Sequence, residues 1–507
     1  MSVPEEIRRV ERPKNTVVHD TGTKGPKRFA VRERSYVKYI RGGNPQPYTG
    51  KTIGYIIDNK YVPKAETQPK SEVEPPALSY GKSALVKSVS QDVLDNLLSV
   101  YDANNAFAIM AMATLKVIKP GITSKRMSTE YSRTFVCKDY PGAALSKNSI
   151  TNLLQKIGMD GERRKQFYQL RMAEVSAEHH VAIDGTLKQD NSDVNDLSHF
   201  SRKSRIKNTK DVSVIYAYDI DLMEPVCAKV FPGNHIDAKS YKSFIHDNDV
   251  RKGLAITDKG FPVKEIEEEL KERPDLHFLT PLKKNDIRIK NNDMLSFDGV
   301  LPDIEGSIPC KKKKIKGGRY LYSFRDPELA CEQEKTYIEK HKEEKDFDEK
   351  KYAKALQTFG IIVFESDVDI ESKIAYLAYH DRWKIELVFK RYKNDECLDK
   401  TNVQGDFTVI GAEFVNFIAT LLTCRIIRKA EDAKLLDDMT YGELMDDLSS
   451  AWRKTDAPTD PATDDGGWVY NFNYLFDELE ALGLSKPAPK PEPQKRGRKP
   501  KTKDKKE

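Results

Sequence analysis

The sequence predicts an α/β fold, α+β overall, organised around one sheet with acidic residues at two strand ends. Two observations predict it. Patterns typical of strand, strand, strand, helix and strand follow one another at 181–184, 212–220, 226–230, 238–250 and 253–258. The first and last of these strands deliver Asp184 and Asp258 into glycine-containing turns. Because α/β sheets build their sites at strand ends, both aspartates are candidate site residues.

Residues 1–76 are expected to form a basic arm and a small β module. The segment up to residue 28 is polar and basic and has no periodicity. Short β-prone pieces follow at 36–40 and 52–57, separated by a turn rich in glycine, and they predict a β-hairpin. A Pro-containing stretch at 63–76 predicts a linker.

Residues 77–178 are expected to form a helical domain. Apolar residues recur at helical spacing at 97–117 and again at 146–178. Such a domain either packs against the sheet or contacts a partner of the protein, and the sequence favours neither.

The signature stretch of the chain lies at 379–393. As one helix it would place Tyr379, Arg382, Glu386 and Lys393 within about 60° of arc, since successive residues turn by about 100°. A carboxylate would then be flanked by an aromatic hydroxyl and two cations. Together with the two strand-end aspartates, Glu386 makes a set of hard oxygen ligands of the kind that Mg²⁺ or Mn²⁺ prefers.

These motifs resemble those of the DDE transposases of bacterial insertion sequences. The spacing Tyr-x2-Arg-x3-Glu-x6-Lys resembles the YREK signature of that family. The blocks around Asp184 and Asp258 resemble its first two acidic motifs, and the turn at 232–237 resembles the Gly-Asn-x-x-Asp turn between them. The resemblance extends over about residues 175–425.

The resemblance implies an RNase H-like catalytic core with a mainly β insertion between Asp258 and Glu386. The implied parts are the core at 179–285 and 366–430, the insertion at 286–365, C-terminal helices at 431–485 and a disordered basic tail at 486–507. Strand patterns at 320–324 and 360–364 agree with a β insertion, whereas a charged stretch at 332–354 is typical of a helix.

The resemblance also implies an enzyme that cuts transposon ends and joins them to target DNA. Asp184, Asp258 and Glu386 would be catalytic and would bind two Mg²⁺ ions, for which Mn²⁺ could substitute. Arg382 and Lys393 would hold DNA phosphates, and Tyr379 would hydrogen-bond a phosphate near the cut. The partners would be double-stranded DNA, both terminal repeats and target, and a second copy of the chain on that DNA.

Some members of the family stack a flipped base on a Trp of the insertion. This insertion contains no Trp, because the three in the chain are Trp383, Trp452 and Trp468. Stacking of a flipped base on a Trp of the insertion is therefore not expected here. Tyr320, Tyr322 and Phe324 are alternative stacking residues.

Composition predicts a cytoplasmic, nucleoid-associated protein without a membrane partner. No signal-peptide pattern or long apolar run is apparent, and the six cysteines include no CxxC, so neither a zinc site nor a disulfide framework is expected. Residues 1–64 carry a net charge of +8 and residues 486–507 carry +7. Basic ends suit a partner that is a polyanion. Alternatively, the two basic ends serve only to increase solubility.

The basic tail contains a short motif at 495–500 that resembles an AT-hook. Its Arg496-Gly-Arg498 core is of the type that lies in the narrow minor groove of A·T-rich DNA.

Two other functions remain open from the sequence. One is a structure-selective DNA nuclease on the same fold, which cuts without joining. The other is a non-catalytic DNA-binding protein derived from a transposase. The complete Tyr, Arg, Glu and Lys set and the long insertion argue against the first, and the three intact carboxylates argue against the second.

Overall fold

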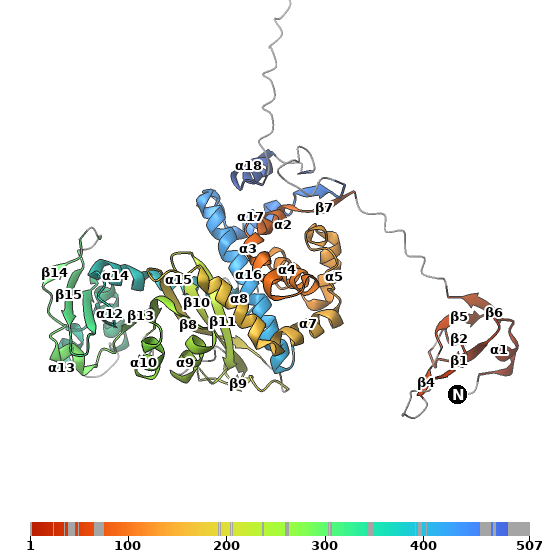
Figure 1. Cartoon of the computed structure of the whole chain (residues 1–507), viewed down its shortest axis with the longest axis horizontal. Helices are drawn as coiled ribbons and strands as arrows, with labels where there is room; N and C mark the ends of the chain where they lie inside the picture. The colour runs from red at the N-terminus through yellow and green to blue at the C-terminus, as the bar shows by residue number, and fades with distance from the viewer. Residues whose placement is uncertain are drawn as a thin grey trace, which may run out of the picture. The chain divides into compact units, whose positions relative to one another are not determined.

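The computed structural model describes two compact units, Met1–Pro76 and Ala77–Glu507, shown in Figure 1. The described residues run from 3 to 484, with gaps at 24, 35, 39–45, 49, 65–75, 191, 193, 203, 205, 236–237, 259–262, 303, 305–306, 342–347, 391, 394–397, 402, 457–467 and 470–472. Most of the predicted linker and the whole basic tail therefore lie outside the described residues.

The first unit contains an antiparallel sheet in the order β1, β2, β5, β6. Its elements are α1 (Glu5–Arg9), β1 (Thr16–Asp20), β2 (Phe29–Glu33), β5 (Thr52–Ile57) and β6 (Lys60–Pro63), and β3 (Tyr36–Lys38) pairs separately with β4 (Gln46–Tyr48). The strand predicted at 52–57 is found. The segment expected to be an arm instead contains α1 and β1, because the β-branched run of β1 pairs along its whole length with β2.

Helices open the second unit. They are α2 (Gly81–Lys87), α3 (Gln91–Val100), α4 (Ala103–Ile118), α5 (Ser124–Arg133), α6 (Val136–Asp139), α7 (Lys147–Met159) and α8 (Gly161–Ala173). Helix α4 is rich in alanine, isoleucine and methionine and is buried on nearly all sides, as such a composition predicts. Asp102 caps it by accepting a hydrogen bond from the Asn105 backbone N–H at 3.0 Å.

A cluster of two arginines and two carboxylates fastens these helices to the sheet. Arg171 of α8 is 1% exposed and pairs with Asp92 of α3 and with Glu224, the first residue of β11. Arg425, on the long helix α16 (Asp406–Asp432), binds the same two carboxylates, at 2.6 Å each. Four elements that are distant in sequence therefore meet at one alternating charge cluster.

The second unit is organised around a large mixed sheet. Its strand order is β11 (Glu224–Pro232), β10 (Lys210–Asp219), β8 (His180–Gln189), β12 (Lys252–Thr257), β13 (Asp275–Pro281), β17 (Ile361–Ser366), β16 (Tyr320–Arg325), β15 (Pro309–Lys314) and β14 (Gly299–Val300), and β9 (His199–Phe200) pairs with β10. Helix α9 (Ala238–Asp247) precedes β12, and α10 (Val263–Lys271) follows it. The predicted order of three long strands, helix and strand is therefore present, with the short β9 added. Strand β12 is parallel to β8 and β13, and the other pairs are antiparallel.

The segment predicted as an insertion continues this same sheet. It contributes β14 to β17, since β17 pairs antiparallel with β13 and so covers what would otherwise be an open edge. Between the strands lie α11 (Ile287–Asn291), α12 (Pro327–His341) and α13 (Glu349–Leu356). The charged stretch at 332–354 is thus largely helical in its described part, and a second small core forms around Met294 and Leu321.

The C-terminal part covers the sheet and the helical domain. Its elements are α14 (Ser372–Asp381), α15 (Trp383–Lys390), α16, a 3₁₀ turn (Leu435–Asp437), α17 (Tyr441–Leu448), β18 (Trp452–Lys454), β19 (Trp468–Val469) and α18 (Asn473–Ala481); β18 lies between β19 and β7 (Ala77–Ser79). Figure 1 shows α16 between the N-terminal helices and the sheet. Within the described residues α16 alone is long and apolar enough to cross a membrane, and 83% of its most apolar window is buried inside the protein. Such burial is that of a core helix.

Candidate active site

Parallel pairing of β8 and β12 places the two predicted aspartates side by side. Ile183 lies opposite Thr257 in the register, so Asp184 and Asp258 lie at the same level of the sheet. Only Asp258 lies at a strand end. The strand end and turn predicted at Asp184 are wrong, because β8 continues through Gly185 to Gln189 and pairs with β10 along this length. Asp184 is half-buried and accepts a hydrogen bond from the Gly185 backbone N–H at 2.8 Å. Asp258 is exposed at the end of its strand.

The single helix predicted at 379–393 is wrong, because the helix is interrupted at Arg382. Helix α14 ends at Asp381 and α15 begins at Trp383. Across the break the hydrogen bonds span three residues, from Arg382 N to Tyr379 O and from Ile385 N to Arg382 O, both at 3.1 Å. These bonds are of the 3₁₀ type, and no Pro or Gly in the sequence indicates the change.

Arg382 lies between two of the predicted carboxylates. Its Nη1 is 3.7 Å from Asp184 Oδ2, and its Nη2 donates to Glu386 Oε1 at 3.2 Å. Its guanidinium also lies over the ring of Tyr379, 5.6 Å from the centroid. The junction of α14 and α15 thus directs one cation at a carboxylate of β8 and a carboxylate of α15 together.

The charges of Asp258 and Glu386 both affect Asp184. Burial raises the pKa of Asp184, and the charges of Asp258 and Glu386 raise it further, while the Gly185 N–H and Arg382 act in the opposite direction. Like charges at this spacing destabilise one another unless a cation lies between them. In this structure Arg382 provides that cation.

Two tyrosines border the cluster, and the sequence predicted only one of them. Burial raises the pKa of Tyr379. Burial also raises the pKa of Tyr241, on α9, and the nearby charges of Asp184 and Asp258 add to the effect. The only sequence feature that could have indicated Tyr241 is its position in the first turn of the helix after the 232–237 motif. A tyrosine in an amphipathic helix is too common to be selected on that basis.

Lys393 lies away from this cluster. It is close enough to Asp211 to oppose the rise in that residue's pKa that burial causes. Asp211 faces Gln189, which is five residues, or about 17 Å of strand, beyond Asp184. The predicted common face of four residues is therefore not found. Arg496 and Arg498 of the tail lie outside the described residues.

Of the three aromatic residues considered for stacking, the structure leaves one at the surface. Tyr322 and Phe324 are 0% and 1% exposed, so both belong to the core rather than to a stacking surface. Tyr320 is half-buried, and the ammonium groups of Lys312 and Lys314 lie 5.7 and 5.4 Å from its ring centroid. This basic and aromatic corner lies on strands β15 and β16.

The site contains the types of ligand that a metal ion needs, but the ligands are not close enough together to bind one. Carboxylate oxygens are the donors that Mg²⁺ and Mn²⁺ prefer. Among the described residues, however, no group of three His, Cys, Asp or Glu side chains lies close enough together to hold an ion. Arg382 occupies the space between Asp184 and Glu386 that a cation would need.

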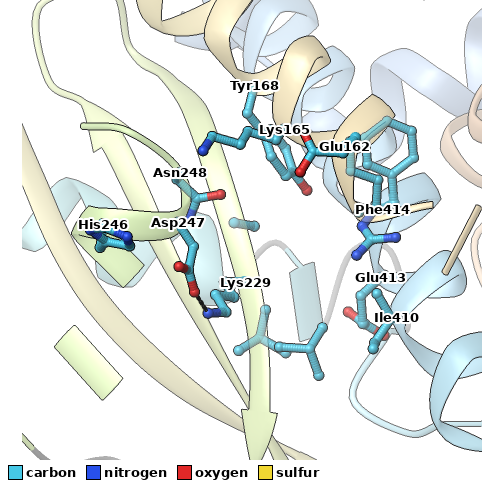
Figure 2. Close-up of a pocket in the computed structure, with 15 residues that line it drawn as sticks. Glu162, Lys165, Tyr168, Lys229, His246, Asp247, Asn248, Ile410, Glu413 and Phe414 are labelled. Carbon is cyan, nitrogen blue, oxygen red and sulfur yellow. Dashed lines mark hydrogen bonds and ion pairs between the residues drawn. The ribbon is translucent and has the colours of Figure 1, made fainter. Parts of the chain in front are cut away.

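Of two cavities in the second unit, one borders the site. One, of about 240 Å³, is bordered by Asp258 and Tyr379 and is otherwise lined mainly by apolar residues such as Leu282, Ile361 and Val363. Figure 2 shows the other, of about 340 Å³, which lies between α8, the strands β10 and β11, and α16. The second cavity contains none of the predicted site residues.

Comparison with known proteins finds one family and a similar solved structure. Residues 176–421, which include Asp184, Asp258 and Glu386, match the family described as "Transposase DDE domain". No match to a curated protein is found. Among solved structures the chain is similar to the piggyBac transposase in its synaptic complex with hairpin DNA, at 10% identity and a TM-score of 0.37, over 81% of this chain and 87% of that one. Residues 176–421, just under half of the chain, are therefore similar to a transposase DDE domain.

Proposed function

We propose that the protein is the transposase of a bacterial insertion sequence, with an RNase H-like core that cuts transposon ends and joins them to target DNA. The observation that supports this proposal best is the convergence of three acidic residues from β8, β12 and α15. They lie 74 and 128 positions apart in the chain, yet the charges of Asp258 and Glu386 both affect Asp184. Arg382 then contacts two of them.

Asp184, Asp258 and Glu386 would hold two Mg²⁺ ions, which supply activation of the attacking hydroxyl and stabilisation of the leaving oxygen in an in-line displacement. To admit cations, Arg382 must release the two carboxylates. Its guanidinium would then be free to bind a DNA phosphate through two hydrogen bonds. Tyr379, beneath it, would orient the same phosphate.

DNA contacts outside the carboxylates would come from basic and aromatic surfaces. Tyr320 with Lys312 and Lys314 offers a stacking face with adjacent positive charge. The cavity bordered by Asp258 and Tyr379 has room for a base turned out of the helix. Lys393, the basic N-terminal unit and the Arg496–Arg498 motif would add phosphate and groove contacts.

Two further properties are part of the proposal. Joining requires two DNA ends in one complex, so we expect a dimer on DNA. The net positive charge of both chain ends favours association with the nucleoid in the cytoplasm.

The test is cleavage and joining of labelled DNA that carries the element's own ends, with Mg²⁺. The parent is expected to release a 3′-OH and transfer it to a second duplex. Glu386→Gln should lose both steps and still bind DNA. Glu371→Gln, an exposed position at the start of α14, is the matched control and should behave as the parent does.

The other outcomes separate the competing functions. Cleavage without joining by the parent would identify a nuclease. Binding without chemistry in both the parent and Glu386→Gln would identify a non-catalytic DNA-binding protein.

A further inference from the structure

A buried polar network joins the strand that carries Asp184 to the chain that follows Glu386. Lys188 Nζ donates to Glu413 Oε1 at 2.6 Å and to Tyr392 Oη at 3.1 Å. Tyr392 in turn donates to Glu413 Oε2 at 2.5 Å, and Asn416 Nδ2 donates to Glu413 Oε1 at 2.9 Å. None of the four side chains is more than 3% exposed.

The network involves the same strand as Asp184 and the chain segment that follows Glu386. Lys188 is four residues beyond Asp184 on β8, so both side chains point to the same face of the sheet, about 13 Å apart along the strand. Tyr392 lies six residues beyond Glu386. Its ring also packs against Tyr216, the residue that faces Asp184 across the β8–β10 pair.

Backbone hydrogen bonds support the same connection. Gln189 N donates to Asp399 O at 3.0 Å, and Thr401 N donates to Gln189 O at 2.9 Å. The end of β8 is therefore held by the segment after α15 through main chain and side chains alike.

Stability alone does not explain a buried ion pair at this place. Moving a lysine and a glutamate out of water costs most of what their attraction returns, and apolar side chains of similar size often stabilise a fold as well or better. Aromatic packing by Phe389 and Phe417 against Tyr216 already closes this part of the core. The polar network adds a defined geometry, because a hydrogen bond constrains both the distance and the direction between two groups, which apolar contact does not.

We propose that Lys188, Glu413 and Tyr392 are positioning residues that set the separation of Asp184 and Glu386. The inference rests on the proposed function, in which Asp184 and Glu386 share the bound cations. The network would hold β8 and α15 in one geometry while Arg382 exchanges with a metal ion.

The test compares three full-length proteins in solution: the parent, Tyr392→Phe, and Lys188→Met paired with Glu413→Leu. Tyr168→Phe is the matched control, because Tyr168 is also a buried tyrosine that contacts α16, on the side of the cavity in Figure 2. The measurements are thermal stability, hydrogen exchange of the α15 amides, Mn²⁺ affinity by calorimetry, and the kcat and KM of DNA cleavage.

We expect both network variants to remain folded, with Tm near that of the parent. Exchange in α15 should rise, Mn²⁺ affinity and kcat should fall by about 10- to 100-fold, and KM for DNA should change little. The control should match the parent in each measurement. A merely structural role would lower Tm and leave Mn²⁺ affinity and the kcat of the folded protein unchanged.

Folded network variants with parental α15 exchange would overturn the inference, whatever their activity. If the parent itself neither binds Mn²⁺ nor cleaves DNA, the proposed function fails. Increased α15 exchange in the network variants would then still show that the network holds α15.

Discussion

Replacing Arg382 by glutamine should strengthen the binding of divalent cations. Arg382 is 15% exposed in its side chain and pairs with Asp184, at 22%, and Glu386, at 59%. A cation that binds these carboxylates must first displace the guanidinium. Removal of that competitor therefore favours the metal, although Arg382→Gln should weaken the contact with DNA that we propose for the same side chain.

The size of the effect follows from the two ion pairs. Unit charges 4 Å apart attract by about 4 kcal/mol in a medium of intermediate polarity, and desolvation removes much of this. The largely exposed Glu386 pair is worth about 1 kcal/mol at most. With a similar amount for the longer Asp184 pair, the competition is worth about 2 kcal/mol, which corresponds to about a 30-fold increase in affinity.

Calorimetric titration with Mn²⁺ in the absence of DNA measures this change. The matched control is Arg319→Gln. Arg319 also bridges two carboxylates, Glu365 at 2.8 Å and Glu267 at 3.1 Å, and is 22% exposed, but it lies outside the site. Its variant should bind Mn²⁺ as the parent does. Unchanged or weaker binding by Arg382→Gln would refute the view that Arg382 occupies the cation position.

Three further changes test other parts of the structure. Arg171→Met removes one of the two arginines that pair with the buried Glu224 and leaves Arg425 as the other, so it should lower the free energy of unfolding by about 1–3 kcal/mol in urea denaturation. Tyr320→Ala should weaken DNA binding by about 1–3 kcal/mol in fluorescence anisotropy, and no change would exclude stacking at that corner. Burial and Asp447 raise the pKa of Glu478 to about 7 from 4.5. The protonated form is therefore favoured in the fold, so stability should fall as pH rises between these values, and Glu478→Gln should abolish that pH dependence.

The strand end at Asp258 was predictable because its signal is local. An apolar run that ends at an Asp is recognisable within about eight residues. The same pattern gave the wrong end for the strand of Asp184, because β8 pairs with β10 as far as Gln189 and this pairing is not visible in the sequence. The break at Arg382 was not predictable in the same way. No Pro or Gly lies between Tyr379 and Lys390, so the sequence contains no helix breaker that would indicate the tighter turn.

Contacts between distant parts of the chain explain the remaining differences. The insertion was expected to be a subdomain of its own, yet β17 pairs with β13 and extends the central sheet, which only the three-dimensional register reveals. Likewise nothing near Lys188 in the sequence indicates that a carboxylate 225 positions later neutralises it. Periodicity predicts which faces are buried, but it does not predict which buried polar groups meet.

This difference separates the two kinds of residue that the site needs. Groups that act on a substrate must reach solvent, so they lie at strand ends and helix turns, where sequence motifs are recognisable. Groups that hold them in place lie in the core, as Lys188, Tyr392 and Glu413 do, and their partners come from other elements. If the network sets the distance between Asp184 and Glu386, then a chain could retain every residue of the recognisable motif and still lose catalysis through a change at Glu413. Sequence motifs alone would classify such a chain as active, and the exchange and Mn²⁺ measurements on the network variants would show that it is not.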